Sequence, residues 1–303
     1  MKDKRMLGNA LLLLTALIWG TAFVSQRVGA SRIEPISFNA ARMALATLAV
    51  GGAALSLRKK ENRSPDERRE HDRYTLLGGV CCGVCLTAAS ILQQAGLAYT
   101  TAGKAGFITA LYMLLVPIIR FVFFRDKGTP LVWLAVALGV GGMYLLCVTE
   151  GFRLTRGDTL VCLCAVGFSA HILCCDWFVQ RGDAVGISAL QFLTATVIST
   201  IAAFLTEAPT WDKLVSAAVP ILYCGLISGG LGYTLQITAQ RYTDPTVASL
   251  LMSMESVFAL LAGALLLGER MSPREILGCA VMFAAIVLVQ LPTPGDKKKT
   301  SSK

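Results

Sequence analysis

The chain has 303 residues, of which 54% are hydrophobic and only 16% are charged, and it carries a formal net charge of +9. Because a water-soluble domain has about 25% charged residues, this composition argues against a soluble enzyme, and the scarcity of polar residues argues against a disordered chain. The basic residues gather in a few segments between long apolar stretches, so the positive charge does not indicate nucleic acid, and we expect no such partner.

Ten stretches are apolar and long enough to cross a membrane, which takes about 20 residues for a hydrocarbon core of roughly 30 Å. They are 7–29, 35–57, 75–98, 102–124, 130–148, 158–179, 186–206, 219–240, 246–267 and 274–291. The sequence therefore predicts an all-α integral membrane protein with ten transmembrane helices. The first stretch follows a basic head, as in a signal peptide. Its apolar run is long and no clear cleavage site follows it, so we expect it to remain as a helix.

Lysine and arginine are unevenly divided between the two sides of the membrane that this helix count defines. Of 28 basic residues, 19 fall on the side of the N-terminus and 8 on the other, while Arg42 lies inside the second stretch. Because basic loops stay in the cytoplasm, both termini are expected there, in a multi-pass protein of the cytoplasmic membrane. The charged segment 58–73 is expected to be a solvated loop, although it could also contact anionic lipid headgroups. Residues 292–303 are expected to form a basic cytoplasmic tail.

The two halves of the chain resemble each other at a constant offset of 143 residues. Leu92-Gln93 aligns with Leu235-Gln236, and the segment 126–130 aligns with 269–273. We expect a first repeat at 1–148 and a second at 149–291, each with five helices. Because five is odd, the second repeat must enter the membrane in the opposite orientation. Inverted repeats are typical of secondary transporters, in which similar halves allow two packings of similar free energy around one site.

Four segments carry a resemblance to a known family. They are 13–46, 102–117, 164–192 (CAVGFSAHILCCDWFVQRGDAVGISALQF) and 247–273 (VASLLMSMESVFALLAGALLLGERMSP). In order and spacing they resemble the EamA family of the drug/metabolite transporter superfamily. The resemblance implies ten helices, a central cavity, and export or exchange of small metabolites without covalent chemistry. One departure is Ser256, where many members of the family have proline after the acidic residue. Without this proline, the sequence does not decide whether the ninth helix is kinked.

Glu255 lies in the middle of the ninth stretch. A charge at the bilayer centre costs about 3 kcal/mol and usually faces a cavity or a partner. Glu255 could therefore bind a substrate amine or carry a proton, which makes coupled protons a candidate partner. The alternative is an acid that packs between helices with a hydrogen bond to a neighbour. The repeat places Tyr112, in the fourth stretch, at the equivalent position.

Arg42 lies about one helical turn from Asn39 in the second stretch. A guanidinium group suits bidentate contacts with a carboxylate or a phosphate, so these two residues are candidates for binding an anionic group of the substrate. The alternatives are an ion pair with an intramembrane acid and a side chain that reaches the outer interface.

Neutral polar and aromatic side chains complete the set of candidates. Gln93 and Gln236 are repeat equivalents and could orient a ligand from opposite halves, or could hydrogen-bond the third helix to the eighth. Trp19 and Tyr233 are candidate aromatic walls. His171 is a candidate as well, although a lone histidine in a helix is more often a hydrogen-bonded structural group.

Glycine and proline predict where helices approach and bend. Gly79 and Gly83 form a small-xxx-small pair in the third helix, and Gly225 and Gly229 form one in the eighth. These pairs favour a close approach of the third helix to the eighth. Pro117 is expected to interrupt the fourth helix.

No cofactor or metal site is expected. The ten cysteines lie in apolar stretches, and thiols one or two residues apart on a helix point in different directions. The sequence predicts a secondary transporter that moves small organic metabolites, with amino acids or related compounds as candidates, by alternating access as an exporter or exchanger. The alternatives are a membrane-embedded enzyme, for which clustered acids or histidines would be expected, and a structural membrane protein.

Overall fold

The structure is a computed structural model that describes residues 2–57, 64–100, 102–126, 128–147, 155–267 and 272–290. Every element in these ranges is a helix, as the sequence predicts. The expected boundary between residues 148 and 149, the acid–base pair at 269–270 and the tail at 292–303 lie outside the described residues.

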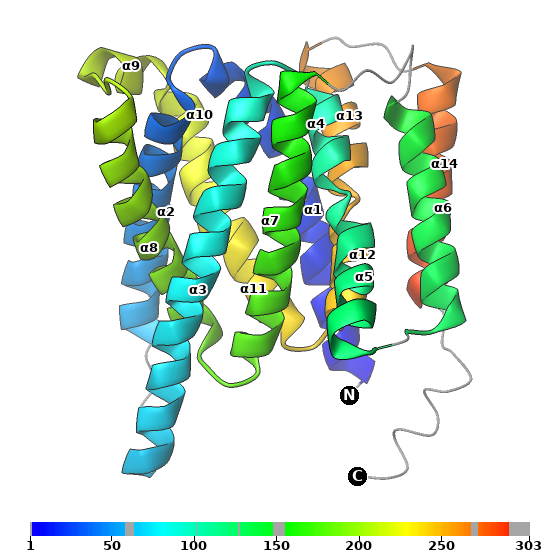
Figure 1. Cartoon of the computed structure of the whole chain (residues 1–303), viewed down its shortest axis with the longest axis horizontal. Coiled ribbons are helices and arrows are strands. Elements are labelled where there is room, and N and C mark those ends of the chain that lie inside the picture. Colours follow the sequence, from blue (N-terminus) through cyan, green and yellow to red (C-terminus); the bar gives the residue numbers. More distant parts are fainter. Residues whose placement is uncertain are drawn as a thin grey trace.

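The first half contains six helices, arranged side by side with those of the second half in Figure 1. They are α1 (Lys2–Ala30), α2 (Pro35–Leu57), α3 (Pro65–Leu97), α4 (Ala102–Thr109), α5 (Tyr112–Phe124) and α6 (Pro130–Cys147). The second half has α7 (Arg156–Val179), α8 (Ala184–Thr206), α9 (Trp211–Ser216), α10 (Ala218–Leu222), the π-helix η1 (Tyr223–Tyr233), α11 (Thr234–Gln240), α12 (Pro245–Met252), α13 (Glu255–Leu267) and α14 (Pro273–Gln290).

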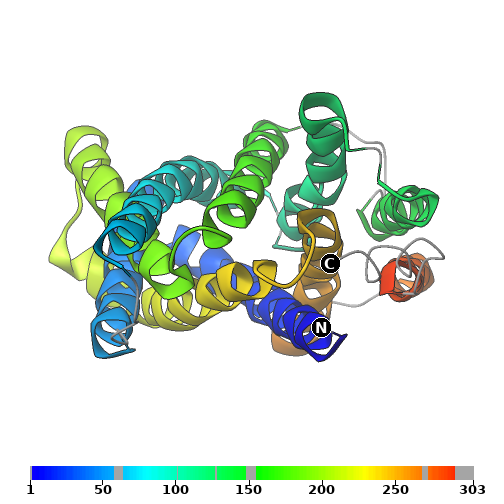
Figure 2. The same ribbon diagram turned by 90° about the horizontal axis from the view of Figure 1, so that it is seen from below.

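Eight helical stretches among the described residues are long and apolar enough to cross a membrane, which makes this a multi-pass membrane protein. The other two of the ten expected spans fall on α6 and α14, whose apolar stretches are the shorter segments 130–142 and 276–285. These two helices pack against each other at one edge of the molecule (Figure 2).

The third helix begins earlier than the sequence analysis expects. Residues 65–74 belong to α3 rather than to a loop. Ser64 starts this helix with a capping box, in which its hydroxyl accepts a hydrogen bond from the Glu67 backbone N–H while the Glu67 carboxylate accepts one from the Ser64 N–H. The cap satisfies backbone donors of the first turn, so a charged segment outside the apolar span continues as helix. The short helix α9, capped by Thr210, is also absent from the sequence prediction.

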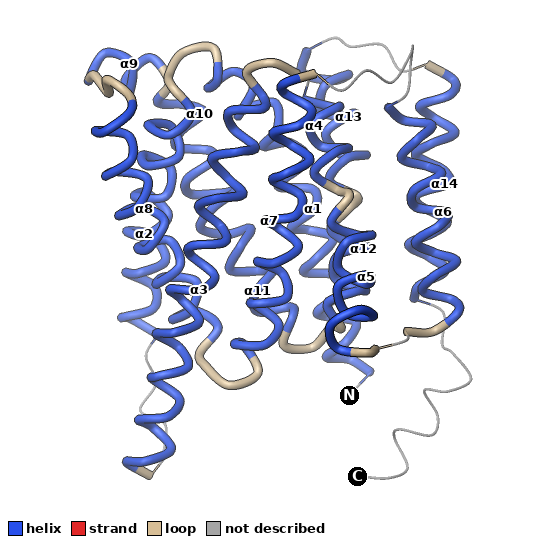
Figure 3. The backbone as a smooth tube through the Cα atoms, viewed as in Figure 1, coloured by secondary structure: helices blue, strands red, loops and turns tan. Residues whose placement is uncertain are grey.

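The fourth and ninth expected helices are each broken into two half-helices. The breaks lie between α4 and α5 at residues 110–111 and between α12 and α13 at residues 253–254, which are equivalent at the offset of 143. Figure 3 shows loop segments where these half-helices lie together. The expected interruption at Pro117 is wrong, because Pro117 lies inside α5 and the chain breaks earlier.

Three serine side chains hydrogen-bond to the backbone around the break in the ninth helix. The hydroxyls of Ser249, Ser253 and Ser256 donate to the carbonyl oxygens of Thr246, Leu250 and Ser253, each three residues earlier. Such bonds offer the backbone a local alternative to the helical ladder and bend the chain. The ninth helix is therefore interrupted without a proline at the break.

The small-xxx-small pairs contact different helices from those expected. A Cβ atom on Gly79 or Gly83 would lie 2.2 Å from Leu190 Cβ or 2.5 Å from Thr194 Cβ, so α3 packs tightly on α8. A Cβ atom on Gly225 would lie 2.8 Å from the carbonyl oxygen of Arg42, so η1 packs on α2. The expected close approach of the third span (75–98, in α3) to the eighth span (219–240, which comprises α10, η1 and α11) is therefore wrong. Each glycine pair instead packs on the second helix of the opposite repeat.

Hydrogen bonds at the two ends of the bundle show that the repeats are inverted. Thr243 donates to Asn9 Oδ1 at 3.2 Å, near the start of α1, and Arg241 donates to the carbonyl oxygen of Gly182 at 2.9 Å, just after α7 ends. At the opposite end, Thr100 donates to Asp158 Oδ1 at 3.2 Å, near the start of α7. The first helix of one repeat therefore begins where the first helix of the other repeat ends (Figure 1).

Candidate functional site

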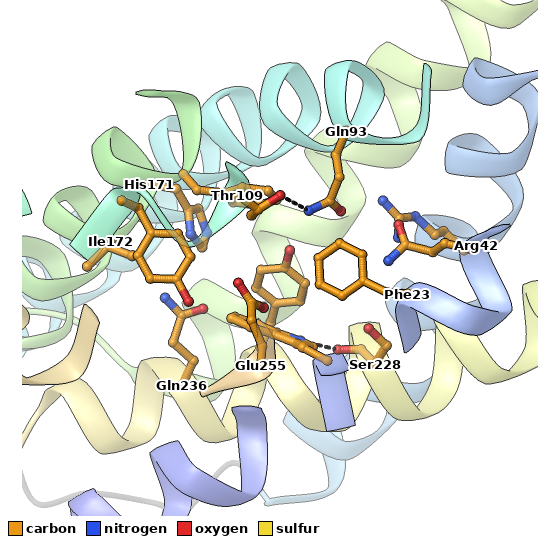
Figure 4. A pocket seen from close by; sticks show the side chains of 14 residues that line it. Phe23, Arg42, Gln93, Thr109, His171, Ile172, Ser228, Gln236 and Glu255 are labelled. Carbon is orange, nitrogen blue, oxygen red and sulfur yellow. Dashed lines mark hydrogen bonds between the residues drawn. The ribbon is translucent and has the colours of Figure 1, made fainter. Parts of the chain in front are cut away.

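A narrow cavity lies in the centre of the bundle. Both repeats contribute its walls, through α1 to α5 of the first and α7, η1, α11 and α13 of the second (Figure 4). Its lining residues are Trp19, Phe23, Gln26, Arg42, Gln93, Thr109, Tyr112, Phe168, His171, Ile172, Ser228, Tyr233, Gln236 and Glu255.

Of the nine candidate residues from the sequence, eight line this one cavity. They are Trp19, Arg42, Gln93, Tyr112, His171, Tyr233, Gln236 and Glu255. The ninth, Asn39, lies behind Arg42 and accepts a hydrogen bond from its Nε atom at 3.0 Å. The structure thus brings the candidates together, while their roles in binding or coupling stay predictions.

Arg42 is held on α2 by neutral groups. Its Nη1 atom donates to Gln26 Oε1 at 3.2 Å, and the amide of Asn39, which accepts from Nε, is itself fixed by a 2.9 Å hydrogen bond to Ser199 Oγ. The Arg42 side chain also stands over the ring of Phe38, at 5.7 Å from the centroid. It is 5% exposed, and within the described ranges no carboxylate lies within the 4.0 Å of an ion pair. The alternative of an intramembrane ion pair therefore does not hold in this conformation.

Glu255 and Tyr112 are the first residues of the two half-helices α13 and α5, directly after the equivalent breaks. They are 3% and 2% exposed, and the carboxyl of one is a neighbour of the hydroxyl of the other. Apart from each other, neither Glu255 Oε1 nor Tyr112 Oη has a hydrogen-bond partner. A polar ligand or a proton at these broken helices would supply a further partner.

Gln93 and Gln236 lie on the cavity wall from opposite repeats. Gln93 Nε2 donates to Thr109 Oγ1 at 3.1 Å on α4, and Gln236 Nε2 donates to Gln240 Oε1 at 3.2 Å within its own helix. Neither glutamine therefore hydrogen-bonds α3 to α11, which was the alternative to a role in ligand binding. Gln236 Oε1 has no partner and remains as an acceptor.

The aromatic wall is built around Tyr233. Its ring packs against Trp19 with centroids 4.6 Å apart and meets His171 edge-on at 5.6 Å. Trp19 Nε1 donates to the carbonyl oxygen of Ser228 at 3.1 Å, and His171 Nε2 lies 2.8 Å from Gln191 Oε1. His171 is thus a hydrogen-bonded group that also borders the cavity.

Six lining residues are not among the nine candidate residues. They are Phe23, Gln26, Thr109, Phe168, Ile172 and Ser228. Apolar lining residues cannot be distinguished by sequence from the other apolar residues of a membrane span. The repeat offers a signal for Phe168, because it aligns loosely with Trp19, which also faces the cavity. Thr109 directly precedes the break between α4 and α5, a break that the sequence analysis did not predict.

The cysteines do not assemble a metal site in the described part of the chain, where no group of three or more possible ligands converges. Two thiols do meet across the repeats, since Cys82 Sγ on α3 lies 3.6 Å from Cys175 Sγ on α7.

Two inverted sets of membrane-spanning helices around one buried polar cavity define the class of multi-pass membrane transporters. The chain belongs to the EamA-like transporter family, whose model matches residues 6–148 and again 155–291. Two matches thus cover nearly the whole chain. Family membership points to a transporter rather than an enzyme.

Similar proteins agree with this assignment. An "Uncharacterized transporter" of Archaeoglobus fulgidus is 27% identical over 288 residues, which cover 95% of this chain and 87% of the relative. A "Probable terminal-alkyne amino-acid exporter" of Streptantibioticus cattleyicolor is 22% identical, with 96% of both chains covered. A solved crystal structure with 15% identity has the same fold, with a TM-score of 0.75 over 96% of this chain and 97% of the other.

Proposed function

We propose that this protein is a secondary transporter that moves small organic metabolites, including amino acids or related compounds, across the cytoplasmic membrane. The observation that carries the proposal is the buried cavity between the inverted repeats. It is lined by repeat-equivalent polar residues, Tyr112 with Glu255 and Gln93 with Gln236. A cavity on the axis that relates two similar halves can face either side of the membrane without a large difference in free energy.

Alternating access gives the contacts at the two ends of the bundle a role. We assign the halves to 1–148 and 149–291 and both termini to the cytoplasm, as the basic residues indicate. At the cytoplasmic end Arg120 pairs with Asp244, and at the outer end Glu34 pairs with Lys213. Each pair joins the two repeats. In this mechanism one end must loosen while the other stays closed.

Export or exchange is the proposed direction, and the amino-acid exporter among the relatives supports an amine-bearing substrate. Glu255 is the proposed coupling group, because a buried carboxyl beside the uncharged Tyr112 hydroxyl can hold either a proton or a substrate amine.

A metabolite export screen tests the proposal. Metabolites in the medium are compared between cells with and without the protein, and each hit is then measured as counterflow in proteoliposomes. Glu255→Gln should lower this flux or its pH dependence at normal expression. The matched variant Glu207→Gln changes a carboxyl outside the cavity, one that accepts hydrogen bonds from Ile36 and Ser37, and should transport normally. If no metabolite moves faster with the protein than without it, the proposal fails.

A further inference from the structure

Two side chains of opposite charge border the cavity, and each lacks a counter-ion. Arg42 comes from α2 in the first repeat and Glu255 from α13 in the second. They are 5% and 3% exposed, respectively. Figure 4 shows them on either side of Phe23, and they are not within the 4.0 Å of an ion pair with each other.

The partners of both groups leave their charges uncompensated. Arg42 is held by two amide oxygens, from Asn39 and Gln26, which carry no formal charge. No hydrogen bond within the described residues uses its Nη2 atom, so the guanidinium keeps donors for a further partner. Glu255 Oε1 has no hydrogen-bond partner apart from the neighbouring Tyr112 hydroxyl, which carries no formal charge. Taking single charges out of water is unfavourable unless each is paired, and charges at membrane depth usually face a substrate path or a partner.

The two charged groups come from different repeats and do not pair with each other in this structure. The hydrogen bonds from Asn39 and Gln26 fix the guanidinium on one side, and Asn39 is itself anchored by Ser199. On the other side, Glu255 is the first residue of the half-helix α13. A single ligand can therefore contact both charges only if it carries a group of each sign.

We infer that the cavity selects zwitterionic metabolites, with Arg42 binding the carboxylate and Glu255 binding the amine. This inference rests on the proposed transport function and assigns the substrate class of the same site. A guanidinium matches a carboxylate in a bidentate geometry, and a carboxylate is the natural acceptor for an ammonium group. Trp19, Phe23 and Tyr233 then border the remaining, apolar part of the ligand.

The test combines ligand truncation with mutation on the purified protein. The probes are L-leucine, isopentylamine, which lacks the carboxylate, and 4-methylpentanoate, which lacks the amine. Zwitterionic 6-aminohexanoate, with its charges further apart, is a fourth probe. Binding is measured by calorimetry in detergent. At least one of the two zwitterions should bind. If leucine binds, isopentylamine and 4-methylpentanoate should each bind at least tenfold more weakly than leucine.

The variants link each charge to one group of the ligand. In Arg42→Gln the preference for the zwitterion over the amine should disappear, while in Glu255→Gln the preference over the carboxylate should disappear. Arg27→Gln and Glu207→Gln remove charges outside the cavity, with Arg27 bonded to the Leu97 carbonyl, and should keep both preferences. Thermal unfolding confirms that each variant is folded. Arg42→Lys and Glu255→Asp retain the charges and replace any variant that does not fold.

Three results would overturn the inference. They are the binding of a singly charged analogue as tightly as its zwitterion, an equal loss of affinity for every probe in either variant, and no binding of either zwitterion. If the export screen still finds a substrate in any of these cases, transport stands and only the zwitterion assignment is wrong. If the screen finds no substrate at all, the proposed function is what fails.

Discussion

At the residue scale, the polar side chains inside the bundle fall into two groups that differ in their partners. Gln94 is fully buried and donates to the backbone oxygen of Gln26 at 3.1 Å, away from the cavity wall. Gln93 and Gln236 lie on the wall, whereas Gln94 does not, although Gln94 and Gln236 each keep an acceptor without a partner. Neighbours in the sequence thus separate into groups that stabilise the fold and groups available to a ligand.

This difference predicts opposite effects of glutamine substitutions. Gln93→Ala should weaken substrate binding and also lower the stability, because its hydrogen bond to Thr109 joins α3 to α4. Gln236→Ala should weaken binding about fivefold, which corresponds to one hydrogen bond of roughly 1 kcal/mol, and change thermal stability little. Gln94→Ala should do the reverse, because it removes only a bond between α3 and α1. Affinity and melting temperature are measured on the same preparations. Equal affinity for all three variants would assign the wall glutamines to packing.

The ion pair of Glu34 and Lys213 at the outer end predicts a pH effect. The hydrogen bond that the Glu34 carboxyl accepts from Lys213 holds the pKa of this carboxyl below its ordinary value. A lowered pKa stabilises the fold above the ordinary pKa, and this contribution is lost as the pH falls through the lowered one. Lys213→Met should lower the stability by about 0.2–1 kcal/mol at pH 7, because the pair is partly exposed.

The check is thermal unfolding of the wild type, Lys213→Met and Lys213→Arg at neutral and acidic pH. Lys213→Arg should behave as the wild type. A deficit in Lys213→Met that stays the same after Glu34 is protonated would show that the pair is not its cause.

At the scale of elements, the half-helix α13 depends on close contact with α1. A Cβ atom on Gly20 would lie 2.4 Å from Phe258 Cβ and 2.8 Å from the backbone oxygen of Glu255. The contact therefore fixes the helix end from which Glu255 reaches the cavity. Such a distance leaves no room for a methyl group, and the backbone oxygen cannot rotate away.

Gly20→Ala should therefore cost about 1–3 kcal/mol of stability and reduce transport, because α13 must shift. Gly52→Ala is the control, since nothing lies within 4 Å of its Cβ position and alanine has a higher helix propensity than glycine. Both variants are compared by thermal unfolding and by flux. If Gly20→Ala unfolds and transports like Gly52→Ala, the tight α1–α13 contact is not required.

The elements also show what sequence reasoning can and cannot reach. Long apolar runs and the offset of 143 predict the helical class and the inverted repeats, because hydropathy and duplication can be read directly from the order of residues. The breaks before Tyr112 and Glu255 are harder to predict, because neither has a proline at the break, and only the second has serine hydroxyls bonded to the backbone around it. The π-helix at Tyr223–Tyr233 has no signal in the sequence analysis beyond its glycines.

The candidate site was easier to predict than the helix partners. A polar residue in an apolar span must be paired or face a cavity, so Arg42, Glu255 and the two glutamines stand out. Apolar lining residues such as Phe23 carry no such mark. The partners of the glycine pairs were predicted wrongly, because small residues indicate close packing without identifying the helix that packs.

At the scale of the whole molecule, inversion predicts that equivalent residues lie on opposite sides of the membrane. Tyr99 and Tyr242 are equivalent at the offset of 143, and they are 58% and 36% exposed. In a cysteine-free background, an impermeant thiol reagent added outside intact cells should label Tyr99→Cys, and Tyr242→Cys should react only after the membrane is opened. Labelling of both from one side would refute the inverted topology.

Access to the cavity from both sides is the claim on which the proposed mechanism depends. Ser228 borders the cavity and is 4% exposed, so a thiol placed there reports the opening of the path. The measurement is the reaction of Ser228→Cys, in the cysteine-free background, with an impermeant thiol reagent in right-side-out and inside-out vesicles. Alternating access predicts labelling from each side, with a rate that substrate changes. Labelling from one side only, with and without substrate and at every pH, would contradict it.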